Sequence, residues 1–228
     1  MKVKIIYEDN HIIVVEKPVN IPSQGDKTGD EDMLTIIKKY LIEKYNKPGD
    51  AYLGLVHRLD RPTGGVMVFA KTSKAASRLS EQIREKKLNK EYLCIVDGKM
   101  ENNTGIFEDY LVKNEKNNLS KVTDKNNKNA KLAKLEYEVL KYDEKINLSL
   151  VRVKLYTGRH HQIRVQFASR NHSLYGDQKY GTRGRGKQIS LWAYKLTIEH
   201  PITKEPMTFT DIPEPVGPWV MIKDFNIM

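Results

Sequence analysis

Short apolar runs and alternating segments predict a chain rich in strands. The runs at residues 3–7 and 12–16, joined by a turn-like Glu-Asp-Asn, predict a β-hairpin. Leu34, Ile37 and Leu41 fall at helical spacing and predict a helix over residues 33–45 that Asp32 can cap. A second helix is predicted from Ser73, its cap, to about residue 86, and a basic helix from near Gly158. An apolar run covers residues 52–56, and further strands are predicted at residues 66–70, 92–96, 132–140, 147–155 and 189–198.

Three segments lack this patterning. Residues 113–134 hold seven Lys and six Asn with little apolar material, so we expect residues 113–131 to form an exposed basic loop or a long hairpin end. A glycine-rich basic loop is expected at residues 181–186. The tail at residues 214–218 carries two prolines, directly after a third at Pro213, and is expected to lie across the surface.

The order of these elements favours an α+β fold with a mixed, mostly antiparallel central sheet flanked by helices. Several neighbouring strands are joined by turns too short for parallel crossovers. A doubly wound nucleotide fold would need a glycine-rich strand-to-helix turn near the start, and the sequence has none. At 228 residues, we expect residues 1–228 to form one domain, with two closely joined subdomains as the alternative.

Composition excludes several classes of protein. The longest aliphatic run is four residues, far short of the roughly 20 of a membrane span. Glu8 and Asp9 interrupt the stretch that a signal peptide would need to keep apolar. The lone Cys94 cannot form an internal disulfide or a thiolate metal cluster. We therefore expect a cytoplasmic protein without a membrane partner.

The net charge of +10 calls for an anionic partner such as nucleic acid, whose phosphates bind Lys and Arg. A generally lysine-rich composition explains the same charge equally well, so charge alone leaves both interpretations open.

The segment from His57 to Gly65, HRLDRPTGG, is the sharpest candidate for chemistry. It lies between two apolar runs, and its proline and glycines favour a tight turn. Asp60 stands between Arg58 and Arg61, whose charge would keep a carboxylate ionised for use as a nucleophile or an electrostatic stabiliser. A structural Arg–Asp pair that fixes the turn would give the same pattern.

Two further segments carry candidate residues. In GRHHQIRVQFA, a helix would bury Ile163 and Phe167 and place His160 and Arg164 one turn apart. The adjacent histidines do not share a helix face and have no carboxylate at ligand spacing, so we expect no metal there. In NKEYLCIV, Tyr92 begins an apolar strand, as either a core residue or a stacking platform for an extruded base.

Together, the segments resemble one enzyme family. HRLDRPTGG followed by VMVFAKT is similar to the HRLDxxTSG signature of the RluA-like pseudouridine synthases. NKEYLCIV, GRHHQIRVQFA and the segment from His172 to Gly181 resemble three further motifs of that family, in the right order. The resemblance extends to both ends of the sequence and covers nearly the whole chain.

The resemblance implies an enzyme that isomerises uridine in RNA, rRNA or tRNA, to pseudouridine without a cofactor. Asp60 would be the catalytic carboxylate, with its point of attack left open. Tyr92 would stack on the flipped uracil, Arg164 would pair with Asp60, and Arg58 would enter the space that the flipped nucleotide leaves. We expect RNA contacts from a wider set: His57, Arg58, Arg61, Arg159 and His161.

The sequence departs from the family pattern in three places, at Gly64, Gln166 and Ser173, none of which carries a catalytic role. We expect a monomeric, stand-alone catalytic domain without the N-terminal ribosomal-protein-like RNA-binding domain of many relatives. Two other functions compete: a catalytically silent RNA-binding or ribosome-assembly protein, and a metal-dependent phosphoesterase.

Overall fold

The computed structural model describes residues 3–181 and 185–223, and the chain divides into two compact units. Unit 1 comprises residues 1–89 and 193–212, and unit 2 comprises residues 90–192 and 213–228. The glycine-rich loop expected at residues 181–186 lies partly outside the described residues.

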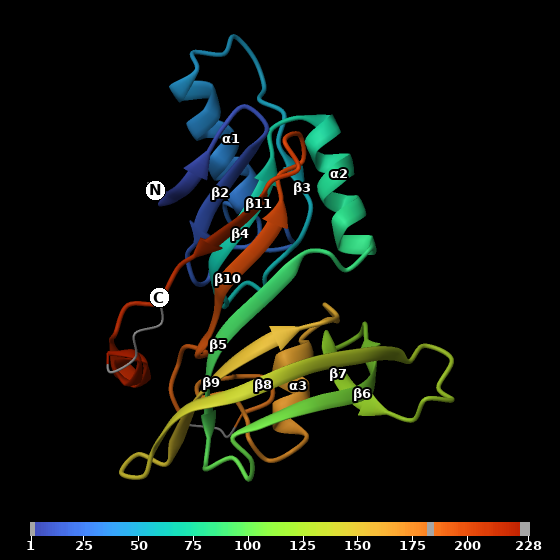
Figure 1. The fold of residues 1–228 in the computed structure, drawn as a ribbon, viewed down its shortest axis with the longest axis vertical. Coiled ribbons are helices and arrows are strands. Elements are labelled where there is room, and N and C mark those ends of the chain that lie inside the picture. Colours follow the sequence, from blue (N-terminus) through green and yellow to red (C-terminus); the bar gives the residue numbers. More distant parts are fainter. Residues whose placement is uncertain (1–2, 182–184, 224–228) are drawn as a thin grey trace. The chain divides into compact units, whose positions relative to one another are not determined.

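A sheet with mostly antiparallel pairing forms the centre of unit 1 (Figure 1). Its strands follow the order β1 (Ile5–Glu8), β2 (Ile12–Lys17), β4 (Gly64–Ala70), β10 (Leu191–Glu199) and β11 (Pro206–Thr210), and β3 (Gly54–Leu55) also pairs with β4. The predicted hairpin is confirmed, because Glu8 pairs with Ile13 across the β1–β2 turn.

Two capped helices accompany this sheet, α1 (Met33–Lys44) and α2 (Ser73–Arg84). Asp32 caps α1 as predicted, its carboxylate accepting the backbone N–H of Thr35 at 3.1 Å. The predicted cap of α2 is one residue late: the hydroxyl of Thr72, not Ser73, accepts the N–H of Ala75 at 3.2 Å. Thr72 has the extended backbone that an N-cap requires, whereas Ser73 is already helical.

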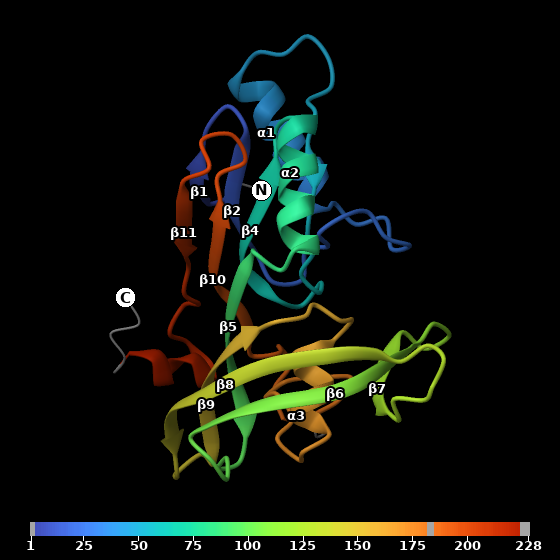
Figure 2. The ribbon, with the colours of Figure 1, turned by 45° about the vertical axis from the view of Figure 1, so that its right-hand side comes forward.

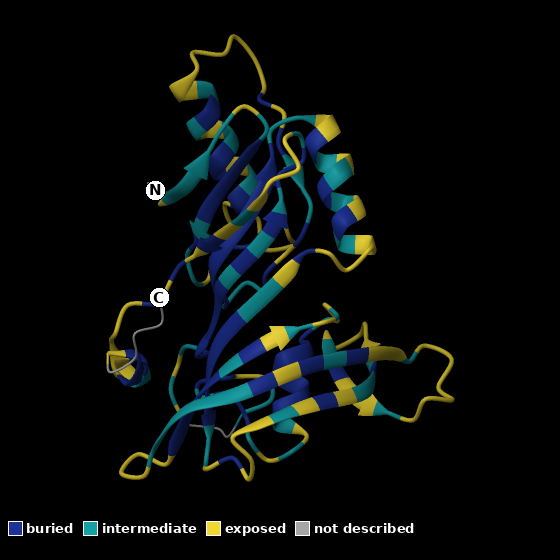
Figure 3. Cartoon of the chain, in the orientation of Figure 1, coloured by how far each residue is buried: buried dark blue, intermediate teal, exposed yellow. Residues whose placement is uncertain are grey.

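Apolar side chains from the strands and α2 form the main core of unit 1. Figure 3 shows β2, β4 and β10 largely in the colour of buried residues. The core contains Ile12, Val14, Val66, Val68, Ala70, Ala75, Leu79, Leu88, Leu196, Ile198 and Phe209.

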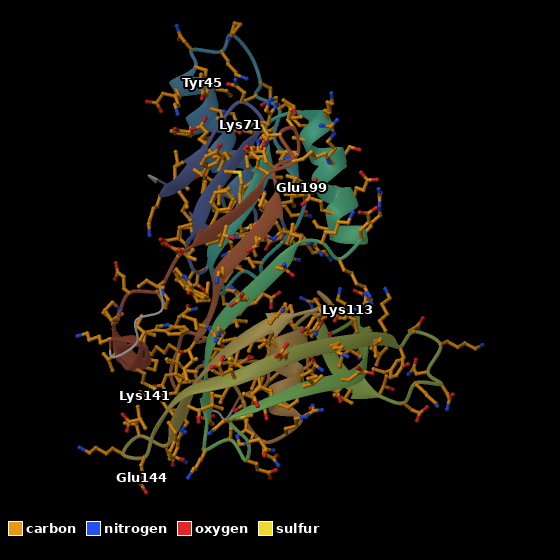
Figure 4. The ribbon with its side chains drawn as sticks, viewed as in Figure 1. Tyr45, Lys71, Lys113, Lys141, Glu144 and Glu199 are labelled. Atoms are coloured by element: carbon orange, nitrogen blue, oxygen red, sulfur yellow. The ribbon has the colours of Figure 1, made fainter. Side chains whose placement is uncertain are left out.

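Glu8 ties the end of α1 to the sheet. Its carboxylate accepts hydrogen bonds from Tyr40, Lys44, Tyr45 and Lys71 at 2.7 to 2.9 Å. Figure 4 labels Tyr45 and Lys71 in this part of unit 1. Burial acts to raise the pKa of Glu8, but the hydrogen bonds from the two lysines and two tyrosines hold it at about 2.

Gly65 is required by a close approach of two strands. Its φ is +113°, and a Cβ at this position would lie 2.3 Å from the carbonyl oxygen of Ala193 and 2.7 Å from its nitrogen. Both contacts are with backbone, which cannot rotate away as a flexible side chain can. The end of the HRLDRPTGG segment therefore packs directly against β10.

We expect Gly65→Ala to lower the free energy of unfolding by about 3 kcal/mol or more, because both the left-handed φ and the clash oppose a side chain. Gly49→Ala is the control, since nothing lies within 4 Å of a Cβ there, and it should change stability by less than about 0.5 kcal/mol. Urea denaturation followed by circular dichroism measures both. Equal stabilities for the two variants would contradict the packing argument.

The strands of unit 2 pair with one another in antiparallel fashion (Figure 2). Their order is β5 (Asn89–Asp97), β9 (Leu148–Leu155), β8 (Lys131–Asp143), β6 (Thr104–Asn114) and β7 (Leu119–Thr123). Helix α3 (Gln162–Ala168) and a 3-10 helix at Gly217–Ile222 complete the unit.

Helix α3 packs on the face of this sheet that bears Phe107 and Tyr137. The ring of Phe167 lies 5.0 Å from Phe107 and 6.0 Å from Tyr137, centroid to centroid. Val165 packs with Leu111 and Ala133 in the same layer. The short helix is held by these contacts, since seven residues are too few to be stable alone.

The structure refines two sequence predictions in unit 2. Of the two forms expected for residues 113–131, it shows the hairpin end: β6 continues to Asn114, and β7 forms inside the segment because its residues pair with β6, burying Ser120. Strand β6 was not among the strands predicted from the sequence. The predicted helix near Gly158 begins only at Gln162, because His161 has a left-handed φ of 53°.

The predicted α+β fold with mostly antiparallel pairing is confirmed. No helix in residues 3–181 or 185–223 is both long and apolar enough to cross a membrane. The same residues contain no group of three or more His, Cys, Asp or Glu side chains arranged to hold a metal ion.

Candidate active site

The candidate residues predicted from the sequence fall into two sets, one in each unit. Unit 1 carries His57, Arg58, Asp60 and Arg61 on the loop between β3 and β4. Unit 2 carries four further candidates: Tyr92, Arg159, His161 and Arg164.

The loop that bears Asp60 is fixed by hydrogen bonds on both sides. The Ser23 hydroxyl accepts the N–H of Leu59 at 3.1 Å and donates to its carbonyl at 2.8 Å. The N–H of Thr63 donates to the carbonyl of Asp60 at 2.9 Å and closes a turn. The backbone N–H of Val68 donates to Nε2 of His57 at 3.1 Å. His57, predicted as an RNA contact, is thus buried and supports β4.

Neighbouring side chains of this loop differ in exposure. Leu59 is buried, Asp60 is half-buried and Arg58 is exposed. Arg61 forms an ion pair with Asp30, and its Nη1 donates to the Thr28 hydroxyl at 3.1 Å. The loop therefore holds a half-buried carboxylate and an exposed arginine on a rigid backbone.

Lys17 also supports this loop, although it was not among the candidates predicted from the sequence. Its side chain is completely buried, and Nζ donates to the carbonyls of Pro18 at 2.8 Å and Arg61 at 2.9 Å. Burial lowers the pKa of Lys17 to about 7, against the opposing attraction of the Asp60 carboxylate. Lys17 lies opposite Gly65 in the β2–β4 ladder. A lysine at the end of the apolar run 12–15 was the signal that could have revealed it.

The titration of Lys17 predicts a pH-dependent contribution to stability. Between pH 7 and pH 10 the unfolded chain keeps this lysine protonated while the folded chain releases the proton, so stability rises with pH. We expect the free energy of unfolding of the wild type, minus that of Lys17→Met, to increase from pH 7 to pH 9.5. Urea denaturation at several pH values measures this difference. A constant difference would mean that burial does not lower the pKa of Lys17.

Tyr92 lies on the same face of its sheet as α3. It pairs with Val153, which pairs with Tyr137, and residues directly opposite each other in antiparallel strands share a face. Tyr137 contacts Phe167 of α3, as described above. Tyr92 is 7% exposed, so most of its side chain is buried.

Arg164 is held rigidly by Asp177. Its Nε and Nη2 donate to the two carboxylate oxygens at 2.8 and 2.7 Å, and the side chains are only 4% and 0% exposed. Asp177 also accepts the backbone N–H groups of Lys179 and Tyr180. The guanidinium carbon lies 5.3 Å from the centre of the Tyr180 ring. A bidentate pair of this kind fixes both position and plane of the guanidinium.

We expect Asp177→Ala to lower the free energy of unfolding by about 3 to 5 kcal/mol, because it leaves a buried guanidinium without its carboxylate. Glu138→Ala is the control: its partner Arg152 and Glu138 are 39% and 45% exposed, so the loss should stay below about 1 kcal/mol. Urea denaturation measures both. Should Asp177→Ala fail to fold, Asp177→Asn tests the same interaction, and a loss equal to that of Glu138→Ala would contradict the argument.

Two histidines connect α3 to β7. The hydroxyl of Tyr180 lies 2.8 Å from Nδ1 of His161 and accepts the N–H of Ser120 at 2.7 Å. His160 bonds the Ser120 hydroxyl at 2.9 Å and stacks on His161 with ring centres 3.7 Å apart. Burial, with the nearby charge of Arg164, lowers the pKa of His161 to about 2. His161 is thus a neutral, structural side chain in the free protein.

His160 does not stand one helical turn above Arg164 as predicted, because it precedes the helix. Arg159 is exposed, and its Nε donates to the carbonyl of Leu132 at 2.8 Å. Asp177 and Tyr180 received no role from the sequence, although they lie in one of the motifs that resembled the family. Their partners are distant along the chain and only the fold reveals them.

A family model described as RNA pseudouridylate synthase matches residues 11–169. The chain belongs to the RNA pseudouridylate synthase family. The matched residues include Asp60, Tyr92 and Arg164, whereas Asp177 and Tyr180 lie beyond them.

Curated relatives and solved structures agree with this assignment. An uncharacterised RNA pseudouridine synthase of Aquifex aeolicus is 36% identical over 226 residues, 93% of this chain and 70% of the relative. Ribosomal large subunit pseudouridine synthase C of Vibrio vulnificus is 32% identical over 93% of this chain and 65% of its own length. The chain thus spans about two thirds of these synthases.

The human protein RNA Pseudouridylate Synthase Domain Containing 4 has the same fold. Its structure aligns with a TM-score of 0.78 over 95% of this chain and 90% of its own, at 22% identity. Human RNA Pseudouridylate Synthase Domain Containing 1 aligns with a TM-score of 0.75 over 95% of this chain and 85% of its own, at 23% identity. The synthase fold predicted from the sequence motifs is therefore confirmed.

Proposed function

We propose that this synthase isomerises uridines in structured RNA, with Asp60 as the catalytic carboxylate. The observation that carries the proposal is a half-exposed carboxylate on a loop that Ser23, Lys17 and the Thr63 turn hold rigid, in a chain of this family. A rigid support matters because catalysis depends on reacting groups being held in place before the substrate arrives.

The reaction rearranges bonds within one nucleotide and consumes no co-reactant. The bond between N1 of uracil and C1′ of ribose breaks, the base turns, and C5 bonds to C1′. C5 loses a proton and N1 gains one, so the atoms balance. Asp60 would attack the sugar or the base, or remove a proton from the sugar. Tyr92 would stack on the uracil, and Arg164 would pair with Asp60.

A base inside a helix is out of reach of such a site, so the nucleotide has to be flipped out. Arg58 suits the vacated position, because it is exposed and forms no hydrogen bond or ion pair with the part of the chain that the structure describes. Phosphate contacts would hold the surrounding RNA, with Arg61, Arg159, His57 and His161 as the candidates predicted from the sequence. The two buried histidines would act indirectly, His57 through the backbone of β4 and His161 through Tyr180.

A lysine-rich surface supports RNA as the partner. Lysines along β6, β7 and their connection to β8 are exposed, and Figure 3 shows the connection in the colour of exposed residues. They are Lys113 (labelled in Figure 4), Lys116, Lys121, Lys125, Lys128 and Lys131. Such a surface neutralises phosphates regardless of base sequence. We infer that rRNA or tRNA is bound in the cytoplasm by a monomer.

We expect wild-type protein to release tritium from RNA carrying 5-tritiated uridine, prepared from cells that lack the gene. Asp60→Ala should bind that RNA normally but release at least about 10³-fold less, because the reaction loses its catalytic group. EDTA should leave the rate unchanged. Separate rRNA and tRNA fractions identify the substrate.

Other outcomes would replace the proposal. Tight binding without release by the wild type would favour the silent RNA-binding protein. Activity that EDTA abolishes would favour a metal-dependent enzyme. Activity retained by Asp60→Ala would remove Asp60 from its role.

A further inference from the structure

Lys90, at the start of β5, has a charge without a partner in the described structure. Its side chain is half-buried, and its Nζ forms no hydrogen bond or ion pair with residues 3–181 or 185–223. Burial lowers the pKa of its ammonium, and no neighbouring group opposes that shift. Lys17 differs, because two carbonyl groups satisfy its Nζ. Withdrawing a cation from water without compensation costs free energy, so an anion that binds here would recover it.

Lys90 stands on the same face of β5 as Tyr92. Residues two apart along a strand share a face, and their Cα atoms lie roughly 7 Å apart. The ladder confirms the arrangement, because Lys90 pairs with Leu155 as Tyr92 pairs with Val153, both on the α3 side of the sheet. The unpartnered ammonium therefore lies one step along the strand from the tyrosine assigned to the uracil.

The space beside the ammonium is open. A Cβ built on Gly158 would meet a single atom within 4 Å, the Nζ of Lys90 at 3.9 Å. The next residue, Arg159, is exposed and adds a second positive charge to this turn. The absence of a side chain at Gly158 leaves room for a ligand oxygen to come within hydrogen-bond distance of Nζ.

We propose that Lys90 binds a backbone phosphate of the RNA, adjacent to the uridine that Tyr92 contacts. The identity of the polyanion rests on the proposed function, whereas the need for an anion follows from the partnerless ammonium. A phosphate supplies the full negative charge that this cation lacks, and a uracil carbonyl would not. Lys90 is a substrate-binding residue in this assignment and takes no part in bond rearrangement.

The test compares Lys90→Gln with Lys90→Arg and with Lys87→Gln as a control. Lys87 is an exposed lysine nearby in sequence whose Nζ already pairs with Glu85 at 2.7 Å. Filter binding measures affinity for the tritiated total RNA described above, from 50 to 300 mM KCl. Initial rates of tritium release on the same RNA give kcat and KM. Thermal unfolding checks that each variant is folded.

We expect Lys90→Gln to weaken RNA affinity about tenfold and raise KM equally, with kcat within about twofold of wild type. The slope of log affinity against log salt should become shallower by about one, the loss of a single phosphate contact. Lys90→Arg should retain most of the affinity, because it keeps the charge. Lys87→Gln should match the wild type.

Two results would overturn the inference: unchanged affinity and salt slope in Lys90→Gln, or a fall in kcat at saturating RNA with affinity intact. The second would place Lys90 in proton transfer or uracil recognition. Failure of the proposed function looks different, since the wild type would then bind RNA and release no tritium. The salt slopes of the variants would still decide the phosphate site.

Discussion

A basic side chain taken out of water needs fixed partners, and each unit of this synthase contains one: Lys17 in unit 1 and Arg164 in unit 2. In unit 1, the buried ammonium of Lys17 is held by two backbone carbonyls, one of them directly after Asp60. In unit 2, the buried guanidinium of Arg164 is held by Asp177. Because every partner is backbone or buried carboxylate, neither group can relax without disturbing the strands and turns around it.

Sequence reasoning reached the fold and the catalytic candidates for a physical reason. The HRLDRPTGG segment combines a proline, two glycines and a carboxylate between apolar runs, and those features act locally. The β1–β2 hairpin, the cap of α1 and the strand that contains Tyr92 depend on neighbours within a few residues. Such elements can be inferred from short windows of the sequence.

The remainder depends on contacts between residues far apart in the chain. Strand β6 carries charged side chains on both faces, so its sequence lacks the regular alternation of apolar and polar residues that predicts a strand. Only its pairing with β7 and β8 defines it as one. Asp177 is 13 residues from Arg164, and Lys17 is 44 residues from the carbonyl of Arg61 that it bonds. The late start of α3 follows from the left-handed backbone of His161, which histidine does not signal. Lys90 was visible within a motif, but its lack of a partner was not.

The close packing of Gly65 on the backbone of Ala193 separates two kinds of information within one motif. This glycine is required by the close spacing of β4 and β10. We therefore expect any chain that retains the fold to retain it, including one that has lost its activity. Asp60 and Arg58 are assigned to catalysis and to base flipping, so we expect them to vary once catalysis is no longer selected. In a degenerate paralogue, the glycine would thus persist as a record of ancestry, and only the acidic and basic positions would report whether the chemistry survives.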